Sequence, residues 1–180
     1  ELFPFEALAR CGARAMRQLK PTQQISGALI AGDPGLREAL RRRYASHGVL
    51  LSDDEIVVTD GALEGLNLCL QAVTQPGDVV AVESPTFYGA LQALERLHLQ
   101  AVEVATDPVT GVDLDSLATL IEREPRLRAC WFMTSFQNPL GALMPTPRKR
   151  ELVELLARHR LPLIEDDVYA ELYDAASAQR

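Results

Sequence analysis

From residue 51 onward, short apolar runs alternate with longer segments of helical periodicity, and this alternation constrains the fold more than any other feature. The apolar runs predict five strands, at 55–59, 79–83, 101–105, 129–134 and 161–165. The segments between them predict four helices, at 62–73, 87–97, 112–123 and 146–160. Strands and helices that alternate over short loops predict an α/β fold of three layers, a mostly parallel sheet with helices on both faces.

The first 50 residues have a different pattern. They hold two helical segments, FEALARCGARAMRQL and LREALRRRYASHG, with the turn sequence AGDPG between them. We expect residues 1–50 to form a helical appendage packed against the α/β unit of residues 51–180.

Composition and charge exclude several classes of function. The 180 residues are 47% hydrophobic and 24% charged, as in an ordinary globular domain with a substantial core. The net charge of −7 argues against binding of a nucleic-acid backbone by this chain, and we expect the basic run 41–43 to be a solvated helix face. No apolar run approaches the roughly 18–20 residues that cross a bilayer, so no membrane partner is predicted.

The cysteines and histidines give no sign of a metal site. Cys69 and Cys130 lie in apolar surroundings and are predicted to be buried thiols, which favours a reducing cytoplasm. His47, His98 and His159 are scattered, and we expect them at helix ends and not as metal ligands.

Ligands of open parallel sheets bind beyond the carboxyl ends of the strands, so the residues that follow each predicted strand are informative. Gly61 follows the run 55–59 and opens a helix with Ala62 and Leu63. Free N–H groups at a helix start suit a phosphate, although a plain turn without a ligand explains this feature alone more simply.

Two further predicted strands are followed by aromatic and amide side chains. Phe87 and Tyr88 stand at a loop-to-helix junction, where they can cover a flat ring or pack into the core. Gln137 and Asn138 precede Pro139 in a stiff turn, and two amides there predict hydrogen bonds to a ligand.

The last strand runs into three carboxylates, Glu165, Asp166 and Asp167, with Tyr169 close behind. With no histidine nearby, these acids offer few ligands even for Mg²⁺ or Ca²⁺, and a metal would not explain the helix start or the aromatic residues. A pyridine ring that carries a phosphate explains all four strand ends, so no metal is predicted.

Four blocks in order, TDGALEGL, PGDVVAVESPTFYGALQAL, QNPLGALM and IEDDVYAELY, resemble the fold-type-I pyridoxal-phosphate (PLP) enzymes of the aspartate-aminotransferase superfamily. The blocks cover essentially residues 30–173. The resemblance implies that the chain is part of the large domain of that fold, with pyridoxal 5′-phosphate as cofactor. It implies seven cofactor-binding residues: Gly61, Ala62, Leu63, Phe87, Asn138, Asp166 and Tyr169.

The resemblance also implies what each residue does. The amides of 61–63 would bind the cofactor phosphate, Phe87 would stack on the ring, and Asn138 and Tyr169 would hydrogen-bond the ring 3-oxygen. Asp166 would pair with the ring nitrogen, because the family pattern places this partner three residues before the tyrosine. A buried carboxylate keeps that nitrogen protonated, and the pyridinium withdraws electrons from the substrate. The acids on either side of Asp166 are expected to serve the local fold.

Within the superfamily, SPTFYGALQAL, QNPLG and IEDDVY look similar to the MocR-type members of the GntR transcription regulators. Those proteins join a winged-helix DNA-binding domain to an aminotransferase-like domain that senses PLP or its amino-acid adducts. The resemblance implies a cytoplasmic sensor that is a homodimer at full length and contacts DNA only through another domain. The alternative is a piece of a catalytic aminotransferase that acts on an amino acid and a 2-oxo acid.

The two lysines, Lys20 and Lys149, both precede Asp166, whereas the family places its Schiff-base lysine after the tyrosine of this block. The resemblance therefore implies a fragment that ends before this lysine. It has no catalytic residue of its own, and we expect it to be inactive as a transaminase.

Overall fold

The computed structural model describes residues 4–18 and 31–170. The chain divides into two compact units, Glu1–Thr59 and Asp60–Arg180. This division comes later in the chain than the boundary at residue 50 expected from the sequence. That residues 1–50 serve as an appendage stays a prediction.

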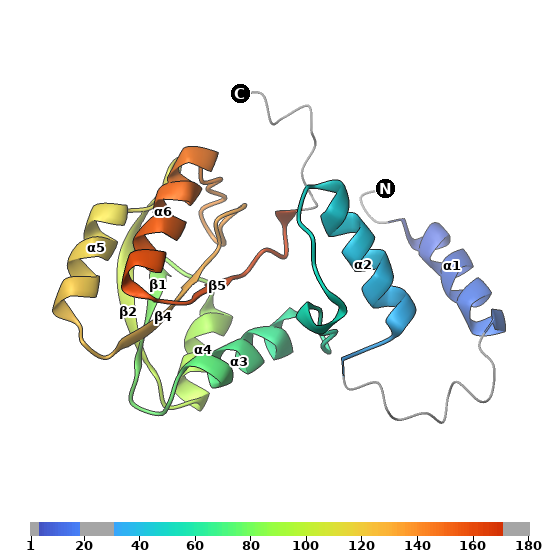
Figure 1. Ribbon diagram of the computed structural model, residues 1–180, viewed down its shortest axis with the longest axis horizontal. Helices are drawn as coiled ribbons and strands as arrows, with labels where there is room; N and C mark the ends of the chain where they lie inside the picture. Colours follow the sequence, from blue (N-terminus) through green and yellow to red (C-terminus); the bar gives the residue numbers. More distant parts are fainter. Residues whose placement is uncertain (1–3, 19–30, 171–180) are drawn as a thin grey trace. The chain divides into compact units, whose positions relative to one another are not determined.

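The Asp60–Arg180 unit is built on a five-stranded sheet in the order β3-β2-β1-β4-β5 (Figure 1). Its strands are β1 (Val79–Ser84), β2 (Gln100–Asp107), β3 (Gly111–Val112), β4 (Leu127–Phe132) and β5 (Leu163–Glu165). The pairs β1–β2, β1–β4 and β4–β5 are parallel, which confirms the predicted parallel sheet. The two-residue strand β3 was not predicted, and it pairs antiparallel with the end of β2.

Four helices cover the two faces of this sheet: α3 (Ala62–Val73), α4 (Tyr88–Arg96), α5 (Leu114–Arg123) and α6 (Thr146–His159). Side chains of a strand point alternately to opposite faces. On β1, Val80 and Val82 pack in a core cluster with residues of α3 and α4. Val79 and Ala81 pack in a second cluster with residues of α5 and α6. The predicted three-layer α/β architecture is therefore confirmed.

Local signals in the sequence mark the starts of two helices, α5 and α6, within two residues of their predicted positions. The carboxylate of Asp113 caps α5 by accepting hydrogen bonds from the backbone N–H groups of Asp115 (2.9 Å) and Ser116 (3.2 Å). Pro147 stands in the first turn of α6, where its missing N–H costs no hydrogen bond.

The predicted strand at 55–59 is wrong. Residues Asp53–Glu55 form a short 3-10 helix, η2, and residues 56–59 are irregular. The backbone N–H and hydroxyl of Ser52 donate to the Glu55 carboxylate (2.7 and 2.9 Å), which stabilises a helical turn at that point. The β-branched residues that follow form no strand ladder. Val58 donates one backbone hydrogen bond, to Ala31 (3.0 Å).

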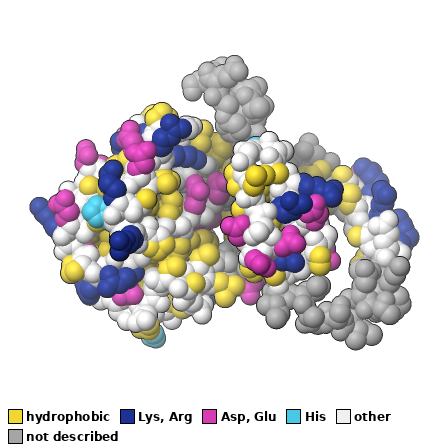
Figure 2. Space-filling model, viewed as in Figure 1, with side chains coloured by type: hydrophobic (Ala, Val, Ile, Leu, Met, Phe, Trp, Pro, Cys, Tyr) yellow, Lys and Arg dark blue, Asp and Glu magenta, His cyan; other side chains and the backbone are white. Residues whose placement is uncertain are grey.

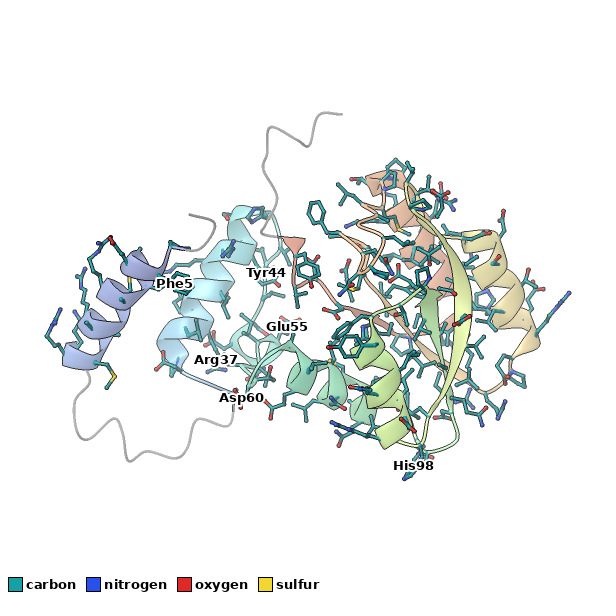
Figure 3. All side chains as sticks on the ribbon, turned by 180° about the vertical axis from the view of Figure 1, so that it is seen from behind. Phe5, Arg37, Tyr44, Glu55, Asp60 and His98 are labelled. Atoms are coloured by element: carbon teal, nitrogen blue, oxygen red, sulfur yellow. The ribbon has the colours of Figure 1, made fainter. Side chains whose placement is uncertain are left out.

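The Glu1–Thr59 unit contains the two helices predicted for it, α1 (Phe5–Gln18) and α2 (Pro34–Ser46). Arg37 of α2, labelled in Figure 3, donates from Nη1 to the carbonyl of Asp53 (3.0 Å) and so joins α2 to η2. Arg41 and Arg42 form ion pairs with Glu38 on the same helix (2.7 and 2.6 Å); Arg41 is half-buried, and Arg42 and Arg43 are exposed. The basic run is thus a solvated helix face, as predicted.

Of the two cysteines predicted to be buried, only Cys130 is. Burial raises the pKa of its thiol to about 12. Cys69 is exposed, so that prediction is wrong: Leu66 and Leu70 occupy the buried side of α3.

The three histidines lie at helix ends, as expected. His47 caps α2, His159 is the last residue of α6, and His98 (Figure 3) follows α4. In the described part of the chain, no helix is long and apolar enough to cross a membrane. On the face of the Asp60–Arg180 unit seen in Figure 2, Lys and Arg side chains are interspersed with Asp and Glu.

Candidate cofactor site

A pocket of about 150 Å³ opens where the carboxyl ends of β4 and β5 meet the starts of α3 and α4. Its lining residues are Ala62, Leu63, Leu66, Phe87, Met133, Asn138, Asp166, Val168 and Tyr169. Six of the seven residues predicted to bind the cofactor are in this set, and Gly61 immediately precedes it as the N-cap of α3. Small-molecule pockets typically measure roughly 300–1,000 Å³, so the described residues surround only part of a ligand of that class.

The start of α3 forms one wall of the pocket. Gly61 has φ = 87°, a left-handed conformation that favours glycine, and the helix begins at the next residue. Glycine has no side chain to cap the helix, and the first N–H groups of a helix have no partner within it. These N–H groups and the positive end of the helix dipole suit an anion, so the backbone of Ala62 and Leu63 can hold a phosphate.

Phe87 is half-buried and forms a second wall just before α4. The ring of Phe87 packs against the backbone of Gly89, where any side chain would collide with it, because a Cβ on Gly89 would lie 2.4 Å from Cε1 of Phe87. Tyr88 is 69% exposed and does not line the pocket. Phe87 alone of the two aromatics can therefore cover a flat ligand, and neither is a core residue.

Asp166 is a buried carboxyl group in the pocket, only 5% exposed. Its backbone N–H donates to the carbonyl of Phe132 at the end of β4 (3.0 Å). Burial raises the pKa of Asp166, although the indole N–H of Trp131 and the backbone N–H of Val168 both donate to the carboxylate and favour its ionised form. A carboxylate held in this way is suited to pair with a cationic ring nitrogen.

The two neighbouring acids have other surroundings. Glu165 is exposed and accepts a hydrogen bond from the hydroxyl of Thr134. Asp167 is also exposed, and its charge contributes to the raised pKa of Asp166. Within residues 4–18 and 31–170, no three His, Cys, Asp or Glu side chains are grouped so that they could hold a metal ion.

The two amides after β4 have different surroundings. Asn138 lines the pocket together with Tyr169, which stands in the turn after β5. Gln137 is 1% exposed, and its Nε2 donates to the carbonyl of Pro85 (2.8 Å) while its Oε1 accepts from the N–H of Leu140 (2.8 Å). The prediction that both amides bind a ligand is therefore wrong for Gln137, whose amide is used within the protein.

Several residues near the pocket were missed from the sequence. Leu66, Met133 and Val168 add an apolar lining. Glu83 is buried at the end of β1, and a charged residue at the end of an otherwise apolar strand was the signal that could have revealed it. Lys149 does not line the pocket and donates to the hydroxyl of Ser135 (2.8 Å). Lys20 lies outside the described residues.

A protein-family model, aminotransferase class I and II, matches residues 7–180. The chain belongs to this family. It is 52% identical over 172 residues to the HTH-type transcriptional regulator YdcR of Escherichia coli, covering 96% of this chain and 36% of that protein. It is 40% identical over 144 residues to a second E. coli HTH-type regulator, YjiR, covering 80% of this chain and 30% of the relative. The chain thus spans about a third of the length of these two regulators.

Among solved structures, the chain is similar to LysN, the α-aminoadipate aminotransferase of Thermus thermophilus. The TM-score is 0.81 and the identity 31%, over 96% of this chain and 42% of LysN. That structure is complexed with N-(5′-phosphopyridoxyl)-L-leucine, and family membership implies PLP dependence for this chain also. The groups in the pocket suit that cofactor: helix N–H groups for a phosphate, an aromatic ring, amide and phenol groups, and a buried carboxylate.

Proposed function

We propose that this chain is the PLP-binding, aminotransferase-like sensor region of a GntR/MocR-type transcription regulator. Its similarity to HTH-type regulators supports this proposal. The net charge of −7 favours a protein in which a different region contacts DNA. We place the regulator in the cytoplasm and propose that the full-length protein is a homodimer.

The observation that carries the cofactor proposal is the buried carboxyl group of Asp166 in a pocket that also holds Phe87, Asn138 and Tyr169. In the proposed complex, Asp166 pairs with the ring nitrogen and holds its proton. Phe87 covers the face of the ring and excludes water, and Asn138 and Tyr169 hydrogen-bond the ring 3-oxygen. The backbone N–H groups of 61–63 bind the phosphate.

PLP, when bound, supplies an electron-withdrawing ring next to an amino-acid substrate or effector. The chain's own contribution is to orient that ring and to keep its nitrogen protonated, because a carboxylate in a site of low polarity favours a cationic partner. We propose an amino acid as the effector, since the chemistry of this cofactor is directed at amino groups.

A second candidate is that the chain is part of a catalytic aminotransferase. The similarity to LysN favours it. The parent reading frame distinguishes the two proposals, because a winged-helix segment encoded before residue 1 supports the regulator. With that segment present, DNA binding by the full-length protein should change when PLP is added. No change would contradict a sensor.

Cofactor binding can be tested on the chain itself, because its single tryptophan, Trp131, donates a hydrogen bond to Asp166. Pyridoxine 5′-phosphate has the ring and the phosphate of PLP but no aldehyde, so it cannot react with lysines. We expect it to change the fluorescence of Trp131 on binding. Asp166→Ala should weaken binding by about tenfold or more, the loss of one charge-assisted hydrogen bond. Asp167→Ala is the matched control, and equal losses would mean that the wrong carboxylate has been assigned.

A further inference from the structure

Glu83 is a carboxyl group only 2% exposed, and the proposed function leaves it without a role. It stands near the end of β1, where its Oε2 accepts a hydrogen bond from the backbone N–H of Met133 (2.8 Å). The side-chain amide of Gln137 donates to the same carboxyl group. Both donors belong to the segment that follows β4 and carries Asn138. Glu83 therefore attaches the end of β1 to one wall of the pocket.

Gln137 extends this attachment to a second wall. Its Nε2 also donates to the carbonyl of Pro85 (2.8 Å), in the loop that leads from β1 to Phe87. Neither Glu83 nor Gln137 lines the pocket. Together they connect the two loops that bring Phe87 and Asn138 into it.

Glu83 also lies close to Asp166, across the end of β4. Glu83 accepts from the N–H of Met133, and Asp166 donates its own N–H to the carbonyl of Phe132, the preceding residue. The pKa of Glu83 is raised to about 7, mainly by burial and in addition by the charge of Asp166. The hydrogen bonds from Met133 and Gln137 stabilise the ionised form and lower the pKa in part. On the side of β1 that faces β2, the residue opposite Glu83 is the uncharged Val104. Among the described residues, Asp166 is the charged group that acts on Glu83.

We propose that Glu83 is a positioning residue of the cofactor site: its ionised carboxyl group holds the segment 133–138 against β1 and acts electrostatically on Asp166. This inference rests on the proposed function in one respect, that the pocket takes a pyridine phosphate. A cationic ring next to Asp166 attracts both carboxylates and so favours the ionised form of Glu83. Binding of the ring therefore releases protons from Glu83 near neutral pH.

The test compares Glu83→Gln with the wild-type chain. Glutamine keeps the size and the hydrogen-bonding capacity of the side chain and removes its charge. Glu103→Gln is the matched control, because Glu103 is exposed on β2, opposite Val82 of β1. The first measurement is the fluorescence of Trp131 without ligand, from about pH 5.5 to about pH 8.5. The second is the affinity for pyridoxine 5′-phosphate over the same range.

We expect the wild-type chain and Glu103→Gln to show a transition of Trp131 fluorescence near pH 7, because ionisation of Glu83 alters the carboxylate to which the indole donates. Glu83→Gln should lack this transition. The ratio of wild-type to Glu83→Gln affinity should rise at least about threefold from pH 6 to pH 8, which corresponds to about half a pKa unit of coupling. The same transition in Glu83→Gln would overturn the inference.

The two proposals fail in different ways. If no variant binds pyridoxine 5′-phosphate, but the ligand-free transition is lost in Glu83→Gln alone, the cofactor assignment falls and the electrostatic coupling between Glu83 and Asp166 stands. If Glu83→Gln does not fold, Glu83→Asp decides. Aspartate keeps the charge but is one methylene too short for the N–H of Met133, so we expect a retained transition and affinity weakened several-fold. Wild-type affinity in Glu83→Asp would refute a positioning role.

Discussion

Glu83→Gln should change how the stability of the protein depends on pH. In the folded chain the pKa of Glu83 is raised from its ordinary value of 4.5 to about 7, mainly by burial. Below about pH 4.5 the side chain is neutral in both states and its burial costs no ionisation energy. As the pH rises from there to the folded pKa, the carboxyl group of Glu83 ionises in the unfolded state but stays protonated in the folded state. The unfolded state is therefore favoured, and the free energy of unfolding falls.

The size of this loss follows from the shift. The rise of the pKa from 4.5 to about 7, at about 1.4 kcal/mol for each pH unit, gives a loss of roughly 3–4 kcal/mol, which is fully developed above about pH 8. Glutamine does not ionise, so the free energy of unfolding of Glu83→Gln does not include this pH-dependent loss. The unfolding free energy of the wild-type chain should therefore fall by about 2–3 kcal/mol relative to that of Glu83→Gln between about pH 5 and about pH 8.

Urea unfolding at several pH values, followed by circular dichroism, measures this difference through linear extrapolation. Glu103→Gln should run parallel to the wild-type chain at every pH, because Glu103 is exposed. A difference between the wild-type chain and Glu83→Gln that stays constant within about 0.5 kcal/mol from pH 5 to 8 would show that the carboxyl group is not held in the surroundings described.

Three further variants test the pocket and the core. Gly89→Ala places a Cβ 2.4 Å from the ring of Phe87, so affinity for pyridoxine 5′-phosphate, read from Trp131 fluorescence, should fall several-fold as the ring moves. Gly12→Ala, where a Cβ meets nothing within 4 Å, is its control. Gly61→Ala should cost about 1–2 kcal/mol in urea unfolding, because φ at this residue is 87°. Leu152→Ala, at a fully buried site of α6, should cost about 2–5 kcal/mol in the same assay.

Each of these three predictions would be contradicted by a specific result. Unchanged affinity in Gly89→Ala would mean that the ring of Phe87 does not contact the ligand. A stabilised Gly61→Ala would contradict the left-handed conformation at the start of α3. A loss below about 1 kcal/mol in Leu152→Ala would mean that this core is less tightly packed than described.

Helices were easier to predict than strands, for a physical reason. The amphipathic pattern of α3 depends only on residues within the helix, and its predicted bounds agree with the structure. A strand needs a partner that is distant in sequence. The β-branched run 55–59 has strand propensity but no ladder partner, and β3 is too short to give a pattern. Cys69 stands three residues after Leu66, a spacing that the helical pattern assigns to the apolar face, so its exposure could not be read from the sequence.

The pocket was predicted for two separate reasons. The rule that ligands collect at the carboxyl ends of parallel strands led to the edge of the sheet at which the pocket lies. The resemblance to the PLP enzymes supplied the particular residues, including the choice of Asp166 among three adjacent acids. The environment of Gln137 could not be read from the sequence, because its partners come from the distant Pro85 and from a turn whose shape depends on the fold.

The position of β4 between β1 and β5 has a consequence for how a ligand meets the site. Asp166 donates its backbone N–H to Phe132 of β4, and Met133 donates its own to Glu83 of β1, so the pocket is attached to two adjacent strands whose core residues are buried. Amides in such a place exchange with solvent only when much of the domain opens. The backbone of the site is therefore preorganised by the sheet, and a ligand spends little of its binding free energy on ordering it.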